Sequence, residues 1–143
     1  MALRISELYR PDLSTPLALR LFLCRVPAGF PSPADDYIDE VFDLNQKLIT
    51  NKSATFLARA EGNSMQGAGI FSGGLLIVDR SLKPAAGKVV VASLNGELVV
   101  KRHGVIEGKP FLLAENPDYA PLPLSEDHEL VIWGVVVHCI HTI

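Results

Sequence analysis

GKVVVASLNGELVVKRHG, residues 87–104, contains the pattern that decides the fold. Two runs rich in β-branched residues flank Asn95-Gly96, a pair that tolerates positive φ at both positions and is typical of a two-residue hairpin turn. We therefore expect residues 89–94 to pair with residues 97–103 as antiparallel strands.

Similar apolar runs continue on both sides of this hairpin, separated by glycine and proline. From residue 53 onward they read ATFLARAEG, GGLLIVDRS, PFLLAE and ELVIWGVVVHCIHTI. Short strands between turn signals predict a mostly β, compact domain. One short helix is expected over about residues 43–50, where Asp43 can cap the free amides.

Composition narrows the class of protein. The chain has 143 residues, 48% of them hydrophobic, which suits one globular domain. Sixteen acidic against thirteen basic residues give a net charge of -3. This balance argues against nonspecific electrostatic binding to nucleic acid or to an anionic membrane. We therefore expect any association with DNA to be made through a partner.

Two cysteines, Cys24 and Cys139, occur without CxxC or Cys/His metal spacing. A disulfide framework is therefore not expected, and the reducing cytosol fits best. We expect neither a metal site nor a cofactor. The apolar run near residue 20 is interrupted by Arg20 and is too short to span a bilayer, so we expect a soluble protein without direct membrane binding.

Residues 1–28 differ from the rest, because prolines are scattered among isolated apolar residues without a sustained period. We expect a flexible N-terminal arm over 1–28 and the β-domain over 29–143. The arm ends at Ala28-Gly29, which has almost no side-chain bulk, and Pro31 and Pro33 favour extended backbone after it. Such a segment fits an active-site cleft.

Two residues could supply nucleophilic chemistry. Ser64 lies in EGNSMQGAG, a turn rich in small residues, and a serine needs a base to take its proton. Lys101 follows Leu98-Val99-Val100 in a predicted strand. A lysine acts as a base only when neutral, and lowering its pKa from ~10.4 to near 7 requires about 4 kcal/mol of desolvation, which an apolar wall can supply.

With these residues in view, the chain resembles the UmuD and MucA type of self-cleaving proteins within the LexA-like family of Ser/Lys peptidases. The matching segments run in family order from residue 28 to 138: AGFPSPADDY, DLNQKLI, SATF, GNSM, GLLIVDRSL, GELVVKR and IWGVVVH. Asn63 and Gly74 depart from the family, which commonly has aspartate at both positions. A DNA-binding repressor is disfavoured, because 28 residues without helical periodicity are too few for a helix-turn-helix domain.

The resemblance implies a LexA-like peptidase β-domain in which Ser64 is the nucleophile, Lys101 the general base and Ala28-Gly29 the cleaved bond. The turn over residues 62–64 could supply backbone donors to the oxyanion. The resemblance further implies an SOS-response protein that forms a homodimer. Its cleavage is stimulated by a RecA nucleoprotein filament, and the product is an accessory subunit of a UmuC-like Y-family translesion DNA polymerase.

Two other classes of function stay open at this point. One is a Ser/Lys peptidase that acts in trans on other proteins, and the other is a non-catalytic module that only docks a polymerase. Ser64 alone has the ordinary interpretation of a turn serine, and Lys101 alone that of a strand lysine whose stem packs on apolar surface.

Overall fold

The computed structural model describes residues 2–16, 18–22, 38–125 and 129–143. They divide into two compact units, one formed by Met1–Pro11 with Ser53–Ile143 and the other by Asp12–Lys52. The predicted cleavage point at Ala28-Gly29 lies outside the described residues. The expected division into 1–28 and 29–143 concerns the cut chain and stays a prediction.

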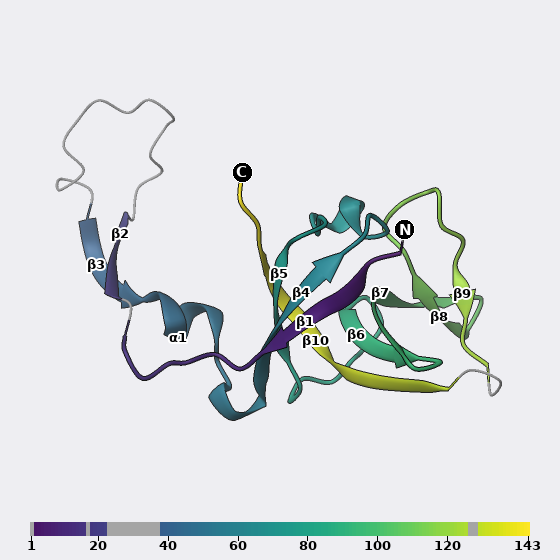
Figure 1. Ribbon diagram of the computed structural model, residues 1–143, viewed down its shortest axis with the longest axis horizontal. Coiled ribbons are helices and arrows are strands. Elements are labelled where there is room, and N and C mark those ends of the chain that lie inside the picture. Colours follow the sequence, from purple (N-terminus) through teal and green to yellow (C-terminus); the bar gives the residue numbers. More distant parts are fainter. Residues whose placement is uncertain (1, 17, 23–37, 126–128) are drawn as a thin grey trace. The chain divides into compact units, whose positions relative to one another are not determined.

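The larger unit is built around one antiparallel sheet (Figure 1). Its strands, in chain order, are β1 Arg4–Tyr9, β4 Thr55–Glu61, β5 Leu75–Asp79, β6 Val89–Leu94, β7 Glu97–Ile106, β8 Lys109–Leu113, β9 Leu122–Pro123 and β10 Leu130–Ile140. In space the order is β1-β4-β5-β10-β6-β7-β8-β9, and β1 also pairs with β7. That last pairing closes six strands into a ring, with β8 and β9 outside it.

The hairpin predicted at Asn95-Gly96 is confirmed. Its strands β6 and β7 pair from Val89↔Arg102 to Leu94↔Glu97, and the turn residues have φ of 51° and 84°. β6 carries consecutive apolar residues because both of its faces are covered: Val91 belongs to the main core cluster and Val90 to a second one.

β7 extends beyond the predicted end at residue 103. Gly104 lies inside the strand, where a Cβ would lie 2.4 Å from a side-chain carbon of Leu113. The chain turns instead at Glu107-Gly108, both with positive φ, to form the β7–β8 hairpin. The expected end of the strand at residue 103 is wrong, because Gly104 makes room for Leu113 and does not form a turn.

The smaller unit contains the expected helix. α1 (Leu44–Leu48) begins after Asp43, whose carboxylate accepts a hydrogen bond from the Asn45 amide at 2.9 Å. β2 (Ala18–Phe22) and β3 (Ile38–Asp43) pair as a separate antiparallel ribbon. No helix in the described ranges is long and apolar enough to cross a membrane.

The N-terminal strand β1 is the main departure from the expected arm. Residues 4–9 pair with β4 from Arg4↔Glu61 to Tyr9↔Leu57, and Arg4 also pairs with Val99 of β7. The signal is the apolar and polar alternation of Leu3-Arg4-Ile5-Ser6, which is too short to stand out before the bulge between Ile5 and Glu7. The fold is mostly β, as predicted, but its first strand comes from the segment expected to be an arm.

Gly62→Ala tests the close packing of the residues before this strand against Gly62. Gly62 has φ of 122°, and an added Cβ would lie 2.4 Å from the Ala2 carbonyl oxygen. We expect Gly62→Ala to lower the free energy of unfolding by about 2–4 kcal/mol, measured by urea denaturation, since backbone strain and overpacking add.

The matched control is Gly108→Ala, which has positive φ but open space around the Cβ position. It should lose only about 1–2 kcal/mol, the cost of the left-handed backbone. Equal losses in the two variants would contradict the close approach of Ala2 to Gly62.

Candidate active site

Ser64 lies just beyond the end of β4, on the loop that connects this strand to the short 3-10 helix η3 (Gln66–Ala68). Its side chain is fully buried, and so is that of Met65, which belongs to the main core cluster. Burial of Met65 in the core therefore fixes the position of the loop, and with it the position of the Ser64 hydroxyl.

The segment after β8, Glu115 and Asn116, forms a brace for this loop through hydrogen bonds. The Glu115 amide donates to the Ser64 carbonyl at 2.8 Å, and the Gly67 amide donates back to the Glu115 carbonyl at 2.7 Å. Asn116 adds a side-chain hydrogen bond, from Nδ2 to the Asn63 carbonyl at 2.9 Å. An ion pair between Arg102 and Glu115 ties the brace to β7.

Lys101 lies in β7, directly after the fully buried Val100. Burial lowers the pKa of Lys101 from its ordinary value of 10.5, because desolvation disfavours the ammonium form. This is the direction that a lysine base requires. The side chain is only partly buried, so water still reaches it.

Tyr119 contacts both sides of the site. Its hydroxyl donates to Asn63 Oδ1 at 2.6 Å, next to the serine, and its ring centroid lies 5.3 Å from Lys101 Nζ. A ring in this position favours the ammonium through its quadrupole, which opposes the effect of burial. Sequence reasoning missed Tyr119, since nothing in AENPDYAP distinguishes a bracing tyrosine from an ordinary loop residue.

The two predicted catalytic residues are also linked through the N-terminal segment. The Leu3 amide donates to Ser64 Oγ at 2.7 Å, and the Leu3 carbonyl accepts from the Val100 amide at 3.1 Å. No hydrogen bond joins Ser64 Oγ to Lys101 Nζ within the described part of the chain. The Leu3 backbone, just before β1, thus connects the buried Ser64 hydroxyl to the residue that precedes Lys101 in β7.

Comparison with known proteins gives this arrangement a family. The Peptidase S24-like family model matches residues 20–137. The chain belongs to the S24-like peptidase family. That match spans the Ser64 loop, its brace and Lys101.

Individual relatives agree with this assignment. The chain is 47% identical to protein SamA of Salmonella typhimurium over 123 residues, which cover 85% of this chain and 84% of SamA. It is 38% identical to protein MucA of Escherichia coli over 122 residues, covering 85% and 83%. It is 41% identical to LexA repressor 1 of Pseudomonas syringae over 114 residues, which cover 79% of this chain and 56% of the repressor. The resemblance drawn from the sequence is confirmed at the level of the family.

Metal ligation is a separate question. Across the residues with described positions, no group of three or more His, Cys, Asp or Glu side chains could hold a metal ion.

Two substitutions of Tyr119 separate its contacts. Tyr119→Phe keeps the ring near Lys101 and loses the hydrogen bond to Asn63, so we expect about 1 kcal/mol less stability and an unchanged Lys101 pKa. Tyr119→Leu also removes the ring, which favours the ammonium, so the pKa of Lys101 should fall further. Titration of Lys101 by NMR measures this. An equal Lys101 pKa in both variants would show that the ring does not act on the lysine.

Proposed function

We propose that this protein is a self-cleaving serine peptidase in which Ser64 and Lys101 cut the bond between Ala28 and Gly29. The observation that carries the proposal is a fully buried Ser64 hydroxyl that the Leu3 backbone joins to β7, the strand in which burial lowers the pKa of Lys101. The S24-like peptidase family supplies the reaction class.

The reaction needs one nucleophile, one base and a tethered substrate. Neutral Lys101 takes the proton of Ser64 Oγ as the oxygen attacks the Ala28 carbonyl carbon, which forms a tetrahedral oxyanion. The bond to the Gly29 nitrogen then breaks, and Lys101 returns the proton to this amine. Water hydrolyses the Ala28 ester, with Lys101 again accepting a proton, and Ser64 is regenerated.

Three features of the site favour this mechanism. The core and the brace fix the position of Ser64, burial favours the neutral form of Lys101, and the substrate belongs to the same chain. A tethered substrate can have an effective concentration of ~10⁵ M or more when it is well aligned. Control of the reaction therefore lies in alignment rather than in encounter.

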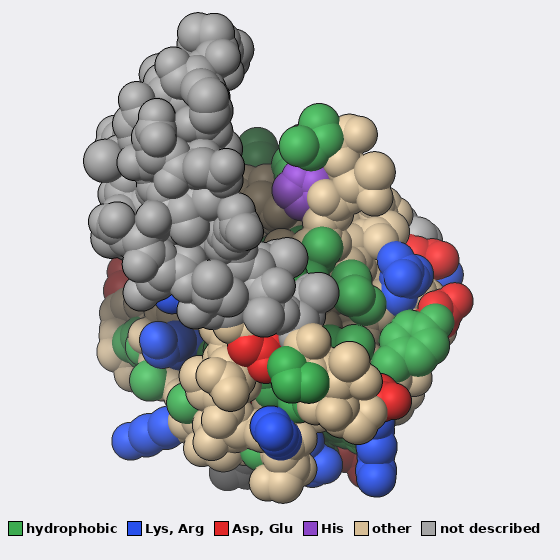
Figure 2. Space-filling view, turned by 90° about the vertical axis from the view of Figure 1, so that its left-hand side faces the viewer, with side chains coloured by type: hydrophobic (Ala, Val, Ile, Leu, Met, Phe, Trp, Pro, Cys, Tyr) green, Lys and Arg blue, Asp and Glu red, His purple; other side chains and the backbone are tan. Residues whose placement is uncertain are grey.

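Similarity to MucA and SamA over most of the chain supports a proposal for the biological role of the cut. We propose that a RecA filament on single-stranded DNA stimulates cleavage in the bacterial cytoplasm. The shortened protein then acts, as a homodimer, as accessory subunit of a UmuC-like Y-family polymerase in translesion synthesis. On the face drawn in Figure 2, basic and acidic side chains are interspersed with apolar ones.

The first test removes the reacting groups. Ser64→Ala and Lys101→Ala should each lower the rate of self-cleavage by roughly 10³-fold or more, and Lys101→Arg should be as inactive because guanidinium stays protonated. Intact mass after incubation with RecA, single-stranded DNA and a nucleotide measures the cut, which should give a product beginning at Gly29.

Lys109→Ala is the matched control, because Lys109 is an exposed lysine at the start of β8. It should cleave at the rate of the unsubstituted chain. Cleavage near that rate in Ser64→Ala or Lys101→Arg, or a product that begins elsewhere, would refute the assignment.

The second test is the pH dependence without RecA. The rate should rise with pH as Lys101 loses its proton, and it should level off below the ordinary lysine value of 10.5, because burial lowers the pKa of this group. Mass spectrometry of samples taken over time gives the rate at each pH. A rate that stays flat between pH 6 and 10 would exclude a lysine base.

A further inference from the structure

The strand β1 and the residues before it fill the seam between β4, which leads into the Ser64 loop, and β7, which carries Lys101. Leu3 is hydrogen-bonded on both sides: its amide donates to Ser64 Oγ, and its carbonyl accepts from Val100. Ala2 packs over Gly62, where there is no room even for a methyl group. Backbone atoms of residues 2 and 3 thus lie directly against the serine hydroxyl.

This segment is seated in the core. The Leu3 side chain is fully buried and belongs to the same apolar cluster as Ala58, Met65 and Val100. Removal of a buried leucine from such a cluster exposes apolar surface and leaves a gap, and both destabilise the fold. Burial of Leu3 therefore stabilises the bound position of this strand.

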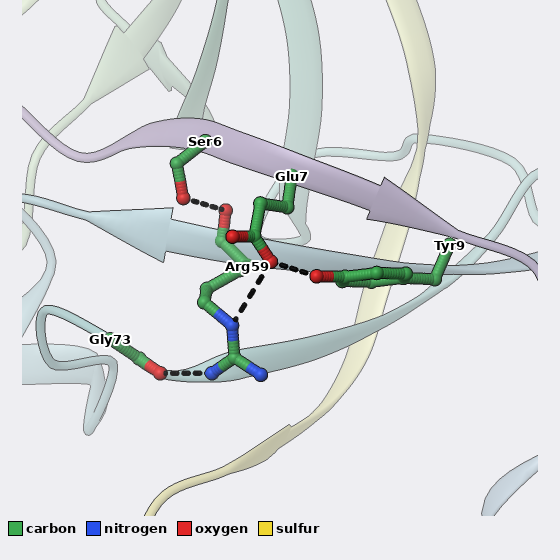
Figure 3. A network of polar contacts seen from close by, with 5 residues as sticks. All are labelled: Ser6, Glu7, Tyr9, Arg59 and Gly73. Carbon is green, nitrogen blue, oxygen red and sulfur yellow. Dashed lines mark hydrogen bonds and ion pairs between the residues drawn. The ribbon is translucent and has the colours of Figure 1, made fainter.

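Polar contacts fasten the exposed side of the same strand (Figure 3). Glu7 lies 3.5 Å from Arg59 of β4 and accepts a hydrogen bond from Tyr9, while Ser6 donates to the Arg59 carbonyl at 3.2 Å. Arg59 also donates to the Gly73 carbonyl at 2.8 Å. On the side of the strand that faces β7, Arg4 lies 3.8 Å from Glu97 of that strand.

An occupied seam conflicts with nucleophilic attack. The Ser64 oxygen must approach a carbonyl carbon to about 3 Å, with donors arranged around the new oxyanion. Here the space beside Ser64 Oγ is taken by the Ala2-Leu3 backbone, and the oxygen accepts the Leu3 amide. A second extended segment cannot use the same place at the same time.

We propose that residues 2–9 are a built-in competitor strand, which must leave the seam between β4 and β7 before the chain can present its cleavage segment to Ser64. This inference rests on the proposed function for the identity of the competing segment. The occupancy itself rests only on the contacts of Leu3 and β1. The first strand of the domain therefore holds the peptidase inactive, and release of this strand is the step that a stimulating partner can accelerate.

A reversible cross-link between β1 and β4 tests the proposal. Glu7 and Arg59 face each other across the strand pair with contacting, half-exposed side chains, so Glu7→Cys with Arg59→Cys places two thiols in register. Cys24→Ser and Cys139→Ala remove the native thiols. Oxidised glutathione accepts the two electrons as the disulfide forms, and dithiothreitol reduces it again.

The expected result is a switch in self-cleavage at alkaline pH. The reduced chain should be cut, and the cross-linked chain should be cut at least tenfold more slowly until it is reduced. Glu7→Cys alone, in the same background and with the same oxidant, should be cut whether oxidised or reduced. Equal cleavage of the cross-linked and reduced double variants would overturn the proposal.

Hydrogen exchange gives a readout that does not need cleavage. In Lys101→Ala, which keeps every contact of Leu3 described above, the Leu3 amide should exchange at least 100-fold more slowly than in an unfolded peptide. Exchange at the unfolded rate would overturn the proposal even if no variant is ever cut. Absence of cleavage together with a protected Leu3 would instead refute the proposed function and leave the strand in the seam supported.

Discussion

The two hydrogen bonds of the Leu3 backbone hold the site and the sheet together. One reaches the Ser64 hydroxyl and the other the Val100 amide, and between them the first strand joins β4 to β7 and closes the ring. A sheet closed in this way leaves no free edge at the seam. The same contact that completes the fold therefore occupies the position from which the peptidase would work.

The site combines a rigid part with an adjustable part. Ser64 is fixed by the core beneath it and by the segment around Glu115, so its position depends on packing and backbone hydrogen bonds. Lys101 is only partly buried, and its protonation is set by burial on one side and the Tyr119 ring on the other. Small changes around the lysine can adjust reactivity without disturbing the nucleophile.

Much of the fold could be predicted from the sequence, because turn chemistry is local. Asn95-Gly96 and the Asp43 cap both lie where their residue types indicate. Gly104 was misleading because its role is to make room for Leu113, a residue brought close only by pairing of β7 with β8. At the site, Ser64 and Lys101 could be proposed from residue type, context and resemblance. The hydrogen bonds from Tyr119 to Asn63 and from Leu3 to Ser64 could not, since they join residues more than fifty positions apart.

Closure of the ring by β1 also means that breaking the chain and releasing the fragment are separate events. A cut after residue 28 falls in the connection beyond β1, so the strand, which has left the seam for the cut, can return to its ladder with β4 and bury its leucine in the core again. The cut removes only the covalent link, and the two pieces become a complex with its own dissociation rate. The time for which the seam stays open after hydrolysis is then set by the competition between rebinding of this strand and loss of the fragment, which dilution or a competing peptide can shift.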